Sequence, residues 1–223
     1  DEDNQKFERS QRISEHMSYQ LLEENDSWQE DMDRMLYILP ISGVAYKKTY
    51  YSPIKGINES KLVLPDDLVI NYYAEDYERA IKTHRMYQNE NEIHELIMSE
   101  HYMDVELEPS EDYSEHQGTE DEVIGLDEPM RSKTYEDALD DQPYLILEQH
   151  TWWDLDGDGY KEPYIITVEY ASKKVLRITA RWELKGIKTN SANNLVKIDA
   201  TEYFTPYGFF PNPESKIYYQ GFG

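Results

Sequence analysis

Apolar side chains recur at helical spacing along the first part of the chain. Between residues 3 and 39 they step by four, seven, four, three and four positions, which places them on one seam of a single helix. The seam consists of Met17, Leu21, Trp28, Met32, Met35 and Leu39. Pro40 is expected to end the helix, because proline lacks an N–H and restricts the residue before it. The pattern predicts a long amphipathic helix over 1–40, whose seam packs either on a neighbouring subunit or on the sheet of its own domain.

The pattern changes to short strands and one helix over residues 41–103. Strands are expected at 45–51, 61–64 and 68–70, a turn at 52–56, and either strand or helix at 81–88. Asn89 and Glu92 then have the spacing of a capping pair. The apolar positions that follow them predict a short helix, so this segment is the first α+β part of the fold.

The chain becomes rich in strands after residue 143. Strands are expected at 144–153, 164–170, 174–182 and 195–204. Residues 171–173 form a tight turn, which makes the second and third of these strands a hairpin. The last segment, 205–223, is dense in Pro, Gly and aromatic residues and has no clear period. The expected class is α+β, with a long N-terminal helix packed on a mostly antiparallel sheet and an antiparallel part over 144–204.

The charge is concentrated and acidic. The 223 residues include 22 Lys and Arg against 46 Asp and Glu, for a net charge of −24. Residues 104–141 alone hold 15 acidic and two basic residues, so 104–143 is expected to be an acidic excursion on the surface. This balance argues against sequence-independent binding to nucleic acid and against adsorption to anionic membranes. The chain has no cysteine, which excludes disulfides and thiolate sites.

One turn has the residues of a cation site. In the run Asp154-Leu-Asp-Gly-Asp-Gly-Tyr-Lys-Glu162, three carboxylates alternate with residues that permit a tight turn. The expected calcium ligands are Asp154, Asp156, Asp158, the carbonyl of Tyr160 and Glu162. The twelfth position of a full calcium loop is Ile165 instead of Glu, and the flanks predict strands, which argues against an EF-hand. An Asp- and Gly-rich hairpin turn without metal is the alternative.

The sequence has no recognisable catalytic constellation. His94-Glu95 lacks the second histidine of a zincin motif, because Met98 stands there. There is no phosphate-binding glycine loop, nucleophile elbow or nucleotide fingerprint. Carboxylates are abundant, but nothing in the spacing selects two of them as an acid–base pair, and a hydrolase is only a residual alternative. The chain is therefore not expected to be an enzyme.

Several stretches, read in order, resemble the portal proteins of short-tailed, lambdoid-like phages, the podovirus portal family. Most of the chain takes part in the resemblance, and no single stretch carries it alone. The stretches are Leu36–Tyr51, Pro65–Ile70, Thr83–Arg85, Asn91–Ile93, Trp153–Pro163, Tyr207–Pro213 and Tyr218–Gly223. The resemblance implies the N-terminal wing portion of a portal subunit, with 205–223 leading towards a stem helix that this chain does not include.

The resemblance also implies a function and partners. Portal subunits form a ring, usually of twelve copies, at one vertex of a phage or prophage capsid. The ring is the DNA conduit for packaging and ejection and docks terminase and tail or adaptor proteins. The implied partners are further copies, capsid and scaffolding protein, and passing double-stranded DNA, with no membrane and no required cofactor. The implied locations are the virion and, during assembly, the host cytoplasm. The residues alone leave an alternative open: a stand-alone acidic, calcium-stabilised module that binds a basic protein.

Overall fold

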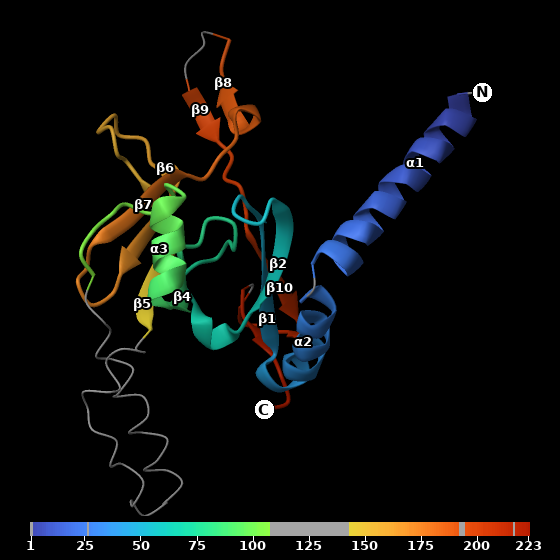
Figure 1. The fold of residues 1–223 in the computed structure, drawn as a ribbon, viewed down its shortest axis with the longest axis horizontal. Coiled ribbons are helices and arrows are strands. Elements are labelled where there is room, and N and C mark those ends of the chain that lie inside the picture. Colours follow the sequence, from blue (N-terminus) through green and yellow to red (C-terminus); the bar gives the residue numbers. More distant parts are fainter. Residues whose placement is uncertain (1, 26, 108–142, 192–194, 216) are drawn as a thin grey trace, which may run out of the picture. The chain divides into compact units, whose positions relative to one another are not determined.

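A computed structural model describes residues 2–25, 27–107, 143–191, 195–215 and 217–223. The chain divides into two compact units. Unit 1 comprises residues 1–68, 72–80 and 201–223, and unit 2 comprises residues 69–71 and 81–200. Each unit combines helix with antiparallel sheet, which confirms the α+β class (Figure 1). The predicted acidic excursion over 104–143 lies almost wholly outside the described residues.

Unit 1 begins with two helices where the seam predicted one. Helix α1 (Glu2–Tyr19) passes into a π-helical turn, η1 (Gln20–Glu24), and α2 (Trp28–Ser42) follows. Asn25 leaves the helical conformation at φ −102° and ψ 83°, and its carbonyl accepts a hydrogen bond from the N–H of Trp28 at 3.1 Å. Asn, Asp and Ser side chains compete for backbone hydrogen bonds and favour helix ends. The unbroken helix over 1–40 is therefore corrected to two helices.

Helix α2 also ends later than Pro40. The proline lies within the last turn, and the helix continues to Ser42. Gly43 then adopts a left-handed conformation at φ 82° and donates its N–H to the carbonyl of Leu39 at 2.9 Å. This is the usual way in which glycine ends a helix, because it adopts positive φ without the penalty of a Cβ. The glycine, and not the proline, sets the boundary.

The sheet of unit 1 has the order β10-β1-β2, and both pairings are antiparallel. Its strands are β1 (Val44–Ser52), β2 (Ile57–Val63) and β10 (Phe204–Gly208), with a small second pair of β11 (Phe210–Pro211) and β12 (Tyr219–Gln220) and a 3-10 turn, η2 (Pro65–Asp67). Helix α2 packs against β1 and β2. The core of this unit contains Met35, Ala45, Tyr46, Val63, Phe204 and Ile217.

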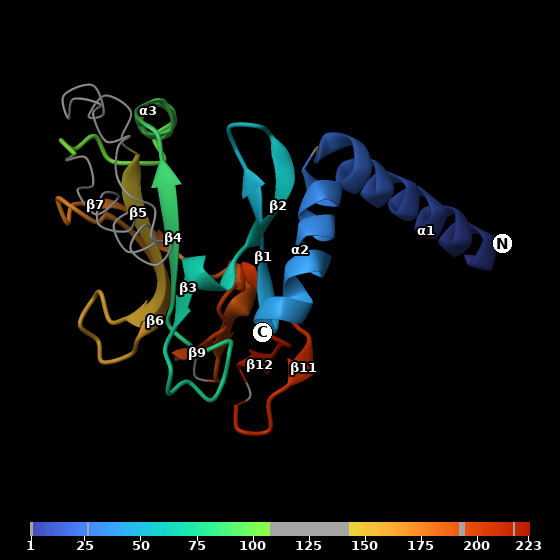
Figure 2. The same cartoon turned by 90° about the horizontal axis from the view of Figure 1, so that it is seen from below.

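Unit 2 is built on a five-stranded sheet of order β3-β4-β5-β6-β7. Its strands are β3 (Leu68–Ile70), β4 (Lys82–Gln88), β5 (Tyr144–Trp153), β6 (Glu162–Glu169) and β7 (Val175–Ala180). Helix α3 (Glu90–Met98) begins at the expected capping box of Asn89 and Glu92. Ile93 of α3 packs with Ile146 of β5 and Leu176 of β7, and Figure 2 shows the helix end-on beside the end of β4.

A small outer sheet completes unit 2. It pairs β8 (Ile187–Thr189) with β9 (Leu195–Ile198) after a 3-10 turn, η4 (Leu184–Gly186). The strand predicted over 195–204 is therefore two strands, since β9 ends at Ile198 and β10 begins at Phe204. The 174–182 and 164–170 predictions match β7 and β6 within a few residues, and these two strands form the expected hairpin.

Candidate functional site

The loop between β5 and β6 carries the predicted cation ligands. Strand β5 ends at Trp153 and β6 begins at Glu162, and these two residues face each other in the antiparallel ladder. Gly157 and Gly159 turn the chain between them at φ values of 77° and 93°. No atom lies within 4 Å of a Cβ built at either glycine, so the left-handed backbone, and not lack of room, favours glycine here.

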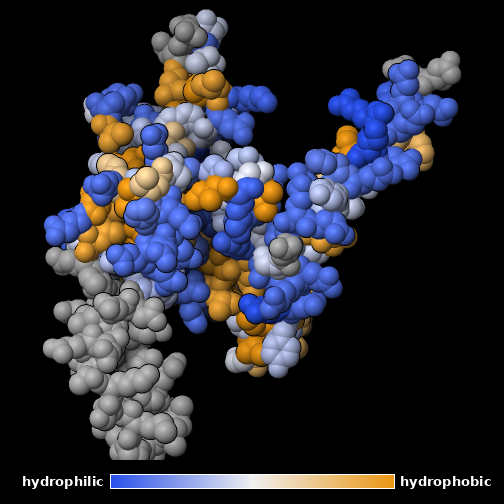
Figure 3. Space-filling model, in the orientation of Figure 1, coloured by the Kyte–Doolittle hydropathy of each residue, from blue (hydrophilic) through white to orange (hydrophobic). Residues whose placement is uncertain are grey.

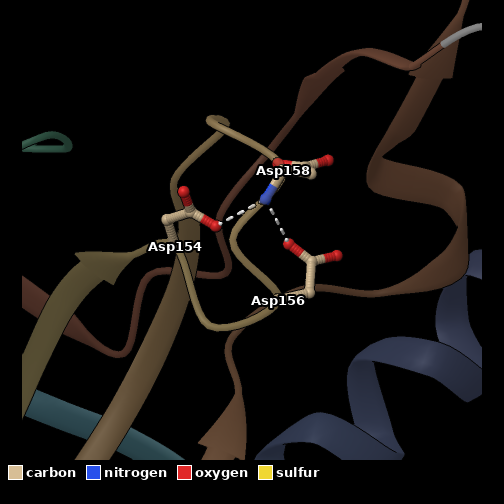
Figure 4. Close-up of side chains that lie close together, drawn as sticks. All are labelled: Asp154, Asp156 and Asp158. Atoms are coloured by element: carbon tan, nitrogen blue, oxygen red, sulfur yellow. Dashed lines mark hydrogen bonds between the residues drawn. The ribbon is translucent and has the colours of Figure 1, made fainter.

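Asp154 organises this loop by accepting backbone hydrogen bonds. Its Oδ1 accepts from the N–H groups of Gly157 and Asp158 at 2.7 and 3.1 Å, and its Oδ2 accepts from Gly159 at 2.9 Å. The N–H of Asp158 also donates to Oδ1 of Asp156 at 3.2 Å. Figure 4 shows the carboxylates of Asp154 and Asp156 on either side of the Asp158 nitrogen. The loop is thus held from within by its own acidic side chains.

The three aspartates form a compact negative cluster. Each of Asp154, Asp156 and Asp158 offers a carboxylate oxygen, and these oxygens lie within 4.8 Å of one another. Asp154 is half-buried and the other two are exposed. Within the described residues, no Lys or Arg pairs with any of them, and no other group of His, Asp or Glu brings three ligand atoms this close. The structure thus brings together three of the five predicted ligands, Asp154, Asp156 and Asp158.

Tyr160 fixes the end of the loop. Its N–H donates to Oδ1 of Asp158 at 2.7 Å, and its hydroxyl oxygen accepts from the N–H of Ile198 in β9 at 3.0 Å. The side chain therefore ties the loop to the outer sheet of unit 2. Its predicted role was to offer a carbonyl, and the hydroxyl contact had no signal in the sequence.

Glu162 differs from the three aspartates because it is buried. Its side chain is only 7% exposed, and its Oε2 has no hydrogen-bond partner among the described residues. Burial raises the pKa of its carboxyl, and the negative charges of Asp156, Asp158 and Asp154 raise it further, against a hydrogen bond from its own N–H. All three aspartates thus raise the pKa of one buried carboxyl group, at the residue where the loop ends and β6 begins.

The second predicted site, the apolar seam, is divided by the structure. Met35 is buried at 2% exposure, and Trp28, Met32 and Leu39 of α2 are half-buried. Met17 and Leu21, which precede the break, are 55% and 37% exposed. The half of the seam on α2 therefore meets its own sheet, and the half on α1 and η1 is left open.

Polar contacts of α2 were not predicted. Oδ2 of Asp31 accepts the N–H of Leu62 in β2 at 2.8 Å. Nζ of Lys47 in β1 lies 5.4 Å from the centre of the Trp28 ring, a cation–π geometry. A polar residue on an amphipathic helix normally marks its solvated face, so the sequence pattern concealed both contacts.

The C-terminal segment of unit 1 contacts the C-terminal end of α2. The N–H groups of Phe222 and Gly223 donate to the carbonyls of Pro40 and Ile41 at 2.7 and 3.1 Å, and that of Phe209 donates to Gly43 at 2.9 Å. A Cβ at Gly43 would lie 2.4 Å from the backbone nitrogen of residue 221. The close approach therefore requires glycine at position 43, besides its positive φ.

Comparison of the chain with protein-family models and with curated proteins gives no match. None of the described helices combines the length and the apolar composition that crossing a membrane requires.

Proposed function

We propose that this chain is the wing portion of a phage portal subunit, a structural protein that acts as part of a ring and not as an enzyme. The ring would conduct DNA during packaging and ejection, dock terminase and tail proteins, and reside at a capsid vertex. The proposal rests on the ordered set of stretches that resemble the podovirus portal family. Comparison with family models adds no support.

One observation carries the proposal beyond the sequence. The stretch 36–51, which contains the end of α2 and most of β1, pairs directly with the stretch 207–213. Val44 lies opposite Gly208 in the ladder, and Gly43 accepts from Phe209. The stretch 218–223 closes on the same helix end through Phe222. Three stretches that were selected only for their resemblance are thus in contact in unit 1, although they lie far apart in the sequence. Such contact is expected if they belong to one family fold.

The open half of the seam agrees with a subunit that has neighbours. Helix α1 exposes large apolar side chains along most of its length, and its main contact is with η1. These side chains are Phe7, Ile13 and Met17, followed by Leu21 and Leu22 on η1. In a ring, an adjacent copy would supply the surface that covers them.

The second candidate is a stand-alone acidic module that binds a basic protein. The uneven charge, with 15 acidic residues in 104–141, favours it. Such binding weakens steeply with salt, because it depends on charge attraction. A portal ring instead depends on a full-length chain that continues into a stem.

Negative-stain electron microscopy of the full-length parent protein tests the proposal. Rings with a central pore are expected. Uniform small particles across a range of protein and salt concentrations would overturn the portal proposal and favour the binding module.

A matched pair of variants tests the role of α1 in the same experiment. Met17→Lys places a charge on the open seam, and Gln5→Lys places the same charge on another face of α1, away from Phe7, Ile13 and Met17. We expect the first variant to lower the yield of rings at least several-fold and the second to leave it unchanged. Equal yields would exclude the seam as a contact between copies.

A further inference from the structure

We infer that α1 of one copy docks on the outer face of α2 of a second copy, with Arg9 near Asp33 and Met17 near Ile41. The inference deepens the ring proposal and rests on it, because it names the surface that covers the open half of the seam. Its basis is a correspondence between two exposed rows of side chains, one on each helix. The rows have the same spacing, carry opposite charge at one end and are apolar at the other.

The first row lies on α1. Arg9, Ile13 and Met17 are spaced by four residues, which places them along one ridge of the helix. All three side chains are exposed. Within the described residues, Arg9 has no ion-pair partner. The row therefore begins with an uncompensated positive charge and continues with apolar side chains.

The second row lies on the solvent side of α2. Asp33, Tyr37 and Ile41 are also spaced by four residues, and all three are exposed. In the part of the chain that the structure describes, Asp33 forms no ion pair. Phe222 widens the apolar end, because its N–H donates to the carbonyl of Pro40 and its side chain is exposed. This row begins with a negative charge and ends in apolar side chains.

The two rows match when α1 and α2 run in the same direction. Arg9–Met17 and Asp33–Ile41 each advance by eight positions, or about 12 Å of helix. In this alignment the guanidinium meets the carboxylate at one end, and apolar side chains meet at the other. Glu30 lies one turn before Asp33 and is already paired with Arg34 at 2.5 Å, so Asp33 is the acid that this alignment uses.

The direction of the helices decides which copy supplies α1. If α1 folded back on α2 of its own copy through the break at Asn25, the two helices would be antiparallel, as in any helical hairpin. Met17 would then lie beside Asp33, and Arg9 beside Ile41, so each charge would face an apolar side chain. Parallel alignment therefore requires a second chain. Because the contact joins two different surfaces of the chain, it is heterologous, and contacts of this type close into rings.

Paired cysteines test the contact directly, because the chain contains no cysteine of its own. The full-length parent protein with Met17→Cys and Ile41→Cys is assembled and then oxidised. We expect a ladder of disulfide-linked multimers on a non-reducing gel. The matched control combines Met17→Cys with Asp33→Cys, two positions that meet only in the antiparallel fold-back. We expect at least 5-fold fewer linked multimers from the control and no internally linked monomer.

Charge reversal gives a second readout without cysteines. Arg9→Asp and Asp33→Arg should each lower the yield of rings several-fold, because each places like charges at the contact. The double variant should restore most of the yield, since it exchanges the two charges. Glu15→Arg is the control, because it reverses a charge on another face of α1 and should leave the yield unchanged.

The outcomes separate this inference from the ring proposal. Rings that form without the Met17–Ile41 cross-link, or an internally linked monomer from the control pair, would overturn the inference and leave the ring proposal intact. A double charge variant that forms no more rings than its single variants would overturn the pairing of Arg9 with Asp33, on which the alignment depends. Failure of the unmodified parent to form rings would overturn both.

Discussion

Helices α1 and α2 share one apolar seam in the sequence but differ in what covers it. In α2 the seam faces β1 and β2, and Met35 is almost completely buried. In α1 the same spacing leaves Met17 more than half exposed, and on the face drawn in Figure 3 the helix is hydrophilic with a few apolar side chains between the polar ones. Periodicity therefore identifies a helix and its apolar side, whereas the partner of that side depends on contacts remote in sequence.

The two helices also differ in how they are attached. Helix α2 has an apolar contact through Met35, a hydrogen bond from Leu62 to Asp31, a ring contact between Trp28 and Lys47, and a glycine end at Gly43. Helix α1 has its main contact with η1. Isolated helices of about this length are marginal in water, because nucleation is costly and propensity alone adds little. Helix α1 therefore needs packing against another surface to be stable, and a neighbouring subunit in the proposed ring would provide it.

Met35→Ala should have the largest effect on the stability of the chain. The substitution removes a buried side chain between α2 and its sheet, which costs about 2–5 kcal/mol through lost burial and a residual cavity. Met17→Ala makes the same change on the open half of the seam and should cost less than about 0.5 kcal/mol. Urea unfolding followed by circular dichroism measures both free energies of unfolding. Equal losses would show that α1 is as well packed as α2 in the isolated chain.

Most strands were predictable from local pattern. Tyr144 to Trp153 is a strand with the predicted ends, and the Asn89–Glu92 pair begins α3 as its capping chemistry requires. The helix break was missed because the apolar spacing continues across it, although Asn25-Asp-Ser27 contains three residue types that favour helix ends. The small strands β11 and β12 carry no periodic signal, since each is only two residues long and the two pair with each other.

The aspartate cluster of the β5–β6 loop was predictable from the sequence, whereas the burial of Glu162 was not. Alternating aspartates and glycines indicated which side chains converge, because ligand spacing in such a turn is a local property. The burial of Glu162 had no local signal, since it depends on how the strands beside β6 pack around it. The same limit applies to Asp31, whose hydrogen bond joins residues 31 positions apart.

Asp31→Ala should lower the free energy of unfolding by a smaller amount, because it removes a hydrogen bond between α2 and β2. The N–H of Leu62 would lose its acceptor, and the cost of an unsatisfied, partly buried donor is about 1–3 kcal/mol. Asp31→Asn keeps an oxygen at the same position and should cost less. Asp33→Ala, an exposed aspartate on the same helix, is the matched control and should stay within about 0.5 kcal/mol of the parent. If both alanine variants unfold at the same denaturant concentration, the hydrogen bond contributes nothing measurable.

Substitution of Lys47 is expected to have the smallest effect on stability, and this effect appears in how stability depends on pH. Burial lowers the pKa of its ammonium group from 10.5, and the charge of Asp31 opposes this shift in part. Between the lowered pKa and 10.5 the unfolded chain binds more protons than the folded chain, so stability rises with pH across that window. Buried Tyr46 acts in the opposite direction, but its pKa is raised from 10.0 to about 12, so its effect begins only near pH 10.

The measurement is therefore a series of thermal unfolding curves between pH 7 and pH 9.5. We expect the Tm of the parent to rise with pH relative to Lys47→Met, by less than the roughly 2–4 °C that about 1 kcal/mol produces in a chain of this size. Lys48→Met is the control, because the next residue of a strand points to the other face of the sheet. Lys47→Met should also unfold no more easily than the parent at pH 7, since methionine fills the same space against Trp28 without a buried charge. A parent curve parallel to that of Lys47→Met would mean that water reaches the ammonium group, and that α2 is less closely packed on β1 than Met35 implies.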